Sequence, residues 1–218
     1  MAKVNLDYSH KGVFTRRGKE ILGAVDIHLS SPCLAVVSGS SGSGKSTLLR
    51  SIAGLVEPAE PRWGLCGRQY QQGELPRWRS RVSLLMQDAP VLDGSVEENL
   101  SFPFRLRYAG PRRFDPQEAG RLLSEVRLDD LDLDGPASKL SGGERHRLSL
   151  VRGLLWSPDV LLADEPLTGL EPELADHCFE LLRLYVQTED KIVICVLHEH
   201  RFSEMADRRF RVEDGRLY

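Results

Sequence analysis

The chain has 218 residues, of which 41% are hydrophobic and 28% charged, and its formal net charge is −3. This composition is that of an ordinary globular protein, and the length suffices for one large core with a small appended subdomain. A mildly acidic chain lacks the overall positive field that draws proteins to nucleic acid, so we expect no nucleic-acid partner.

The sequence carries no recognisable signal for export or membrane insertion. The N-terminal segment has no apolar signal core, and the longest apolar run, Ile192 to Leu197, is much shorter than the roughly 20 residues that span a bilayer. The four cysteines, at positions 33, 66, 178 and 195, include no C-x-x-C pair. We therefore expect a cytoplasmic protein with free, buried thiols.

The first part of the chain alternates strand and helix patterns. Val4 to Tyr8 alternates apolar and polar residues as a half-buried strand does, and Ile21 to Leu29 repeats the alternation after a turn, which predicts a hairpin. Cys33 to Val37 is continuously apolar, as in a strand buried on both faces. A helix from Lys45 to Gly54 and a buried strand from Arg81 to Met86 follow.

The middle of the chain changes character. Residues 88 to 139 lack strand signals and are rich in Arg, Leu, Asp, Pro and Gly. We predict a small helical subdomain there, with helices near Ser95 to Leu100 and Pro116 to Val126.

The last part returns to alternating helices and buried strands. The pattern predicts a helix, a strand, a second helix that begins with proline, another strand, and finally a short helix and a hairpin. The first four are Leu140 to Trp156, Val160 to Ala163, Pro172 to Gln187 and Ile192 to Leu197.

This alternation predicts an α/β fold with a mostly parallel sheet. Residues 1–87 and 140–218 would form a single core that includes an antiparallel β part, and 88–139 would be inserted into it.

A glycine-rich loop lies between the predicted strand 33–37 and the helix after it. Its sequence, Gly39-Ser40-Ser41-Gly42-Ser43-Gly44-Lys45-Ser46-Thr47, matches the pattern G-x-x-x-x-G-K-[ST]. The glycines let backbone N–H groups face phosphate oxygens, and the helix N-terminus adds partial positive charge. Lys45 would reach the β- and γ-phosphates of ATP, and the Ser46 hydroxyl would ligate Mg²⁺. A flexible Gly/Ser turn, the alternative, leaves the strand–loop–helix context unexplained.

Two carboxylates, Asp164 and Glu165, follow the strand 160–163 at its carboxyl end, where α/β sheets bind ligands. Asp164 would hold Mg²⁺ through water, and Glu165 would polarise an attacking water as general base. By themselves they also fit a solvated strand end. The phosphate loop earlier in the chain favours the site.

The signature segment, Leu140 to Glu144, opens the next helix. Ser141 is a good N-cap and Glu144 completes a capping box. Gly142 and Gly143 in a first turn destabilise a helix by roughly 1 kcal/mol each relative to alanine. A helix that tolerates this cost is suited to offering bare backbone N–H groups to an anion.

Together, the phosphate loop, Gln87 after a strand, Leu-Ser-Gly-Gly-Glu and Leu-Leu-Ala-Asp-Glu-Pro resemble the nucleotide-binding domain of ABC transporters in order and spacing. The resemblance implies a Mg²⁺-dependent ATPase in which two copies pair head to tail. Ser141, Gly142 and Gly143 of one copy would close on the γ-phosphate bound by the other. It also implies a membrane permease as partner and a location on the inner face of the membrane.

Further roles follow from the same resemblance. Gln87 is similar to the glutamine that contacts Mg²⁺ or the attacking water and links to the membrane partner. His198 is similar to the switch histidine at the γ-phosphate, and an aromatic residue near the N-terminus stacks on adenine. Phe14 and Tyr8 both qualify, and the distance of Phe14 from Ile21 fits the compact cassettes of the family better. Each is equally well interpreted as a core residue.

Two positions depart from the family pattern. Glu171 stands where aspartate is usual, which affects a dimer contact more than catalysis. His146 stands where glutamine or valine is common, and we expect little consequence.

The expected permease contact lies in Val91 to Arg107, with Phe102 and Phe104 either as exposed anchors or as core of the subdomain. This segment and the short chain are also similar to small cassettes assigned to iron or metal efflux. No substrate follows from that.

Two other functions remain to be weighed. A soluble ABC-type ATPase acting on nucleic acid or ribosomes usually has two cassettes, a coiled-coil insertion or zinc modules, and this sequence has none of them. A small-molecule kinase or another enzyme with a phosphate loop leaves the signature segment and His198 unexplained.

Overall fold

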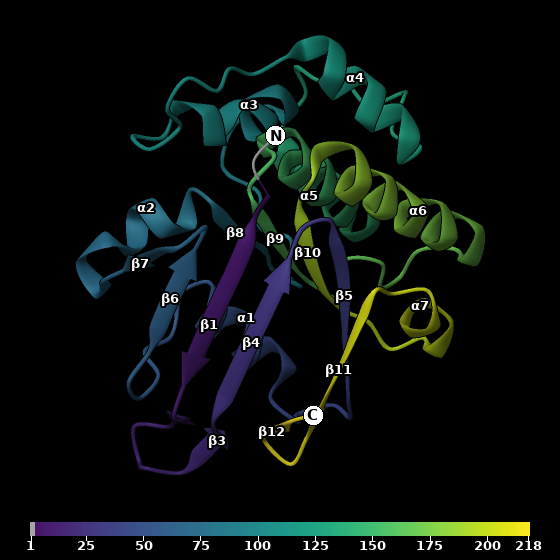
Figure 1. The fold of residues 1–218 in the computed structure, drawn as a ribbon. Coiled ribbons are helices and arrows are strands. Elements are labelled where there is room, and N and C mark those ends of the chain that lie inside the picture. The colour runs from purple at the N-terminus through teal and green to yellow at the C-terminus, as the bar shows by residue number, and fades with distance from the viewer. Residues whose placement is uncertain (1–2) are drawn as a thin grey trace.

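The computed structural model describes residues 3–218, and two main β-sheets organise it (Figure 1). The larger sheet has six strands in the order β12-β11-β5-β10-β9-β8, and it is parallel except at the β11–β12 hairpin. Its strands are β5 (Cys33–Ser38), β8 (Val82–Leu85), β9 (Val160–Asp164), β10 (Ile192–Val196), β11 (Arg208–Glu213) and β12 (Arg216–Leu217).

The central strands of this sheet are buried on both faces, as their continuous apolar sequences predict. Alternate residues enter different cores. In β5, Leu34 and Val36 pack with the helices α5 and α6, whereas Ala35 and Val37 pack with α1 and the second sheet. The parallel sheet therefore separates two apolar cores. The ends of its strands lie at the edge of the sheet, between these cores.

The second sheet is antiparallel, with the order β4-β1-β6-β7. The predicted hairpin strand from Ile21 to Leu29 is divided in the structure. Its first part pairs with β2 in a separate two-stranded ribbon, and its second part pairs with β1, Asn5 lying opposite Ser30. The bounds are β1 (Asn5–His10), β2 (Val13–Phe14), β3 (Glu20–Leu22), β4 (Val25–Ser30), β6 (Arg62–Leu65) and β7 (Arg68–Tyr70).

Helices cover the parallel sheet, and α1 lies between the two sheets (Figure 1). The segment 88–139 contributes α3 and α4, which pack against α5 and α6 on the side facing away from β3 (Figure 1). The helices are α1 (Lys45–Ile52), α2 (Leu75–Arg79), α3 (Val96–Ser101), α4 (Pro116–Glu125), α5 (Gly142–Trp156), α6 (Pro172–Glu189) and α7 (His200–Glu204).

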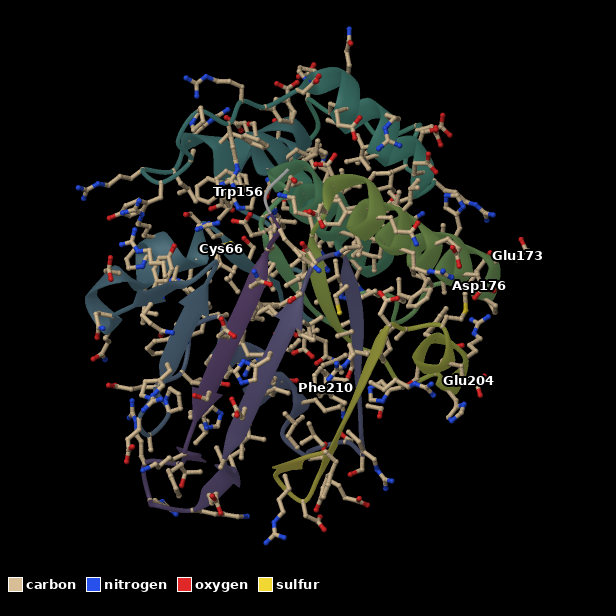
Figure 2. All side chains as sticks on the ribbon, viewed as in Figure 1. Cys66, Trp156, Glu173, Asp176, Glu204 and Phe210 are labelled. Carbon is tan, nitrogen blue, oxygen red and sulfur yellow. The ribbon has the colours of Figure 1, made fainter. Side chains whose placement is uncertain are left out.

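Three of the four free cysteines are buried as expected, but Cys66 is exposed at the β6–β7 turn (Figure 2). The sequence pattern did not predict β6 and β7, so the turn between them was also missed. Among residues 3–218, no helix combines the length and the apolar character needed to cross a bilayer.

Candidate active site

The glycine-rich loop connects β5 to α1 as predicted. Gly39 has φ 144°, and a Cβ added there would collide with the backbone oxygen of Val212. Gly44, the N-cap of α1, has φ 112°. Both conformations are accessible to glycine and costly for other residues. The loop can therefore wrap closely at the N-terminus of α1, an arrangement suited to binding an anion.

Lys45 extends back over this loop. Lys45 as a whole is 6% exposed, and its Nζ donates to the carbonyl oxygens of Gly39 at 2.9 Å and Ser40 at 2.7 Å. In the described part of the chain, no carboxylate lies within ion-pair distance of this ammonium group. A buried cation solvated only by carbonyl groups is suited to binding an anionic phosphate.

Asp164 ends β9 opposite the start of α1. The Ser46 hydroxyl donates to its Oδ1 at 3.2 Å, which brings the last strand residue and the phosphate loop together. Burial raises the pKa of Asp164, and the hydrogen bond from Ser46 lowers it to a smaller extent. The pair offers oxygen atoms beside the loop, the ligand type that Mg²⁺ prefers.

Three side chains contact the Glu165 carboxylate: those of the predicted site residues His198 and Gln87, and that of the neighbouring Thr168. His198 Nε2 lies 2.7 Å from its Oε1, while Gln87 Nε2 and the Thr168 hydroxyl each donate to Oε2 at 3.2 Å. Glu165 has φ 55°, a left-handed conformation uncommon for residues other than glycine. The ends of β8, β9 and β10 thus converge on one carboxylate.

The signature segment forms the predicted capping box. The Glu144 N–H donates to Ser141 Oγ at 3.3 Å, and the Ser141 N–H donates to Glu144 Oε2 at 2.7 Å. Nothing lies within 4 Å of a Cβ built at Gly142 or Gly143. The two glycines therefore present open backbone at the start of α5. The hydrogen bonds of residues 3–218 do not join this segment to the phosphate loop.

The two aromatic candidates for adenine stacking have different surroundings. Tyr8 is 1% exposed, and its ring packs in the core with α1 and the antiparallel sheet. Because a ring enclosed by core side chains has no free face, the prediction for Tyr8 is wrong. Phe14 on β2 is 49% exposed and remains the candidate.

A cavity of about 970 Å³ lies beside the phosphate loop, lined by Ser40 to Ser43, by residues from 15 to 24 and by the C-terminal segment 214–218. The N–H of Gly215 donates to the Ser43 carbonyl at 3.2 Å, so the terminal hairpin supports the loop. The sequence did not predict this contact. The volume of the cavity is within the range of small-molecule sites.

His146 has a contact that the sequence analysis missed. Its Nε2 lies 2.6 Å from the backbone oxygen of Gln87, whereas we expected little consequence from this departure. The sequence feature that could have indicated this contact is the position of His146 on the helix of the signature segment, two residues after Glu144. Glu171, the other departure, is the N-cap of α6 and makes no side-chain capping bond.

Comparison with known proteins gives consistent matches. Residues 22–168 match the family model described as ABC transporter. The lipoprotein-releasing system ATP-binding protein LolD 1 of Caulobacter vibrioides is 34% identical over 202 residues, which are 90% of this chain and 86% of that protein. The phosphonates import ATP-binding protein PhnC of Hydrogenovibrio crunogenus is 33% identical over 211 residues, 92% of this chain and 77% of that protein.

Among solved structures, the fold matches a dimeric, post-hydrolysis state of the ATP-binding cassette MJ0796 bound to ADP and Pi. The TM-score is 0.84 and the identity 23%, with 98% of this chain and 96% of that chain covered. This confirms the predicted α/β fold.

The chain belongs to the ABC transporter family. It is an ATP-binding subunit of that family, with ATP hydrolysis as its activity.

Proposed function

We propose that this chain powers a membrane permease by hydrolysing ATP, with each of two composite sites shared between two copies. The observation that carries the proposal is the position of Glu165. It accepts hydrogen bonds from Gln87 and His198 and directly follows Asp164, which contacts Ser46 of the phosphate loop.

In this proposal the phosphate loop and Lys45 bind the β- and γ-phosphates of ATP. Glu165 takes the proton of the attacking water, and His198 steadies its carboxylate through the 2.7 Å contact. The N–H groups of the loop and the Lys45 ammonium stabilise charge that develops on the transferred phosphoryl oxygens. Phe14 is the proposed adenine contact.

Mg²⁺ is the proposed cofactor, because the structure places suitable donors together. The Ser46 hydroxyl and the Asp164 carboxylate are oxygen ligands in mutual contact, and the Gln87 amide oxygen is the third candidate. A bound Mg²⁺ would neutralise charge on the β- and γ-phosphates.

The exposure of the signature segment supports the proposed dimer. Ser141 and Gly142 are exposed, nothing lies within 4 Å of a Cβ built at Gly142 or Gly143, and no hydrogen bond among residues 3–218 joins them to their own phosphate loop, so this backbone is open to a γ-phosphate from outside its own site. A second copy paired head to tail supplies it, and ATP then holds the two copies together.

The permease is proposed to dock in a groove between the β8 end and the segment 88–139. The groove has a volume of about 600 Å³, and its lining is mostly apolar, including the exposed Phe102 and Leu106. Phe104 instead packs edge-on against Phe114 and Trp156, so of the two proposed anchors only Phe102 is exposed. Trp156, at the end of α5, lies below this segment in Figure 2.

The two relatives are named for different cargoes, a lipoprotein and phosphonates. This fits a subunit at the inner membrane face whose cargo is selected by its permease. Residues 3–218 offer no feature that supports the competing role on nucleic acid or ribosomes.

Turnover of Glu165→Gln tests the chemistry. We expect kcat to fall at least about a hundredfold while ATP still binds, because the amide cannot accept the proton. Thr168→Val, which removes only a neighbouring donor, is the milder control. Undiminished turnover of Glu165→Gln would contradict the proposal.

Purification from native membranes tests the partner: a polytopic membrane protein should accompany the chain, and recovery with nucleic acid would support the competing role.

A further inference from the structure

The second turn of α5 is tied to the backbone of the loop that carries Gln87. His146 Nε2 lies 2.6 Å from the Gln87 carbonyl oxygen. Because a carbonyl oxygen only accepts, the imidazole must donate through Nε2–H. The proposed chemistry uses the side chain of Gln87 and leaves His146 without a role.

A second side chain of α5 holds the other end of the same loop. Arg152 Nη2 donates to the Pro90 carbonyl oxygen at 3.1 Å. Between these two contacts, Ala89 is 1% exposed and has φ 43°, and its N–H donates to the Met86 carbonyl at 3.0 Å. A left-handed alanine persists only where its surroundings enforce it. The loop is therefore a strained turn fixed by α5 at both ends.

This turn sets the position of the Gln87 amide. Its Nε2 donates to Glu165 Oε2 at 3.2 Å, so a small shift of the Gln87 backbone would remove the amide from the carboxylate. The space left between His146, Gln87 and Glu165 is a cavity of about 10 Å³. That is at the lower limit of about 10–15 Å³ that holds one water, so the intact site leaves no room for a network of water molecules between these side chains.

We propose that His146 is a positioning residue for ATP hydrolysis. By holding the Gln87 carbonyl, it places the Gln87 amide against Glu165 and makes the loop move with the helix that begins at the signature segment. The inference rests on the proposed function, since it concerns the same general base. His146 itself is not expected to touch ATP or the reacting water.

The first experiment compares His146→Leu with His146→Gln in the full chain. Leucine fills the site without a donor, so kcat should fall about tenfold, the factor that about 1.4 kcal/mol supplies. KM for ATP should stay within about twofold, because substrate binding is not involved. The glutamine amide reaches about as far as imidazole Nε2 and should restore kcat. His177→Leu is the matched control: its Nε2 contacts Glu125 at 2.8 Å on the surface of α6, and kcat should not change.

The second experiment asks whether His146 acts through Gln87. In a Gln87→Ala background, His146→Leu should cause no further loss of kcat, because the amide that it positions is already missing. Should His146→Leu fail to fold in a thermal melt, His146→Asn replaces it. Its amide is one methylene shorter than that of glutamine, and it should also lose kcat.

Three results would overturn the proposal: wild-type kcat in the donor-free variant, equal losses in the leucine and glutamine variants, or additive losses with Gln87→Ala. Glu165→Gln, measured in parallel, separates the two levels. Active Glu165→Gln contradicts the proposed function, whereas inactive Glu165→Gln with fully active His146→Leu contradicts only the positioning role.

Discussion

In the parallel sheet, β9 and β10 are buried on both faces, whereas β1 and β4 of the antiparallel sheet alternate a buried face with a solvent-exposed one. On that face the charged side chains are paired with one another: His28 lies 2.8 Å from Asp7 and 3.1 Å from Asp26. At the ends of the parallel strands, the Lys45 ammonium has only carbonyl partners.

The difference shows where binding free energy is available. Exposed ion pairs contribute little and are already satisfied, so this face of the antiparallel sheet offers a charged ligand less than the parallel strand ends do. A buried cation and a buried carboxylate gain more from an incoming phosphate and cation. We therefore expect functional effects from the parallel strand ends, and effects on stability alone from the antiparallel sheet.

The largest expected effect comes from the phosphate-loop lysine. Lys45→Ala should weaken ATP binding at least about a hundredfold, since it removes a buried, charge-assisted contact to the phosphates. Isothermal calorimetry measures this directly. The matched control is Lys11→Ala, an exposed lysine paired with Glu60 at 2.8 Å, which should bind ATP like the wild type. Equal ATP binding by both variants would contradict the claim that the parallel strand ends, and not the antiparallel sheet, bind the ligand.

The next effect concerns stability in the antiparallel sheet. Leu6 is fully buried in β1, and Leu6→Ala should lower the free energy of unfolding by about 3 kcal/mol through lost burial and a cavity. Where the variant remains folded, its kcat should equal that of the wild type. Denaturant titration and steady-state turnover measure the two quantities, and a large fall in kcat without unfolding would show that this sheet takes part in the chemistry.

A smaller effect distinguishes two histidines of the same sheet by pH. Burial lowers the pKa of His10 to about 4, below its ordinary value of 6.5. The unfolded chain therefore binds more protons between these values, and stability falls as the pH drops from 6.5 toward 4. His10→Phe should remove on the order of 2 kcal/mol of this pH dependence. Unfolding titrations at pH 7 and pH 4.5 measure it, and an unchanged pH dependence would contradict it.

His28 should show the opposite sign and the smallest effect. Its hydrogen bond to Asp7, with a contribution from the charge of Asp26, raises its pKa. The stability it contributes is present below pH 6.5 and is lost as the pH rises through its higher folded pKa. Because the ring is exposed, His28→Ala should change the unfolding midpoint only slightly, and a change as large as that of His10→Phe would contradict this.

Local sequence predicted the elements whose signals are local. Continuous apolar runs gave β5, β9 and β10, and Ser141 with Glu144 gave the helix start at Gly142. The loop pattern and the strand ends also predicted which side chains would converge, because parallel strands finish at one edge of a sheet.

Contacts between distant segments were not accessible in this way. The short strands β6 and β7, the burial of Tyr8 and the contact of His146 with Gln87 all depend on which segments pack together. Tyr8 illustrates the limit: alternation placed it on one face of a strand, but the core that covers this face comes from α1 and the parallel sheet.

The central claim is that a second copy of this chain completes the site, and the mass of Glu165→Gln with and without ATP tests it most directly. Analytical ultracentrifugation should show a species of 24.5 kDa without ATP and one of twice that mass with ATP. Adding Gly142→Asp, which places a carboxylate where the γ-phosphate of the partner would bind, should abolish the dimer while ATP still binds. A monomer that holds ATP in Glu165→Gln, or a dimer that survives Gly142→Asp, would contradict the account.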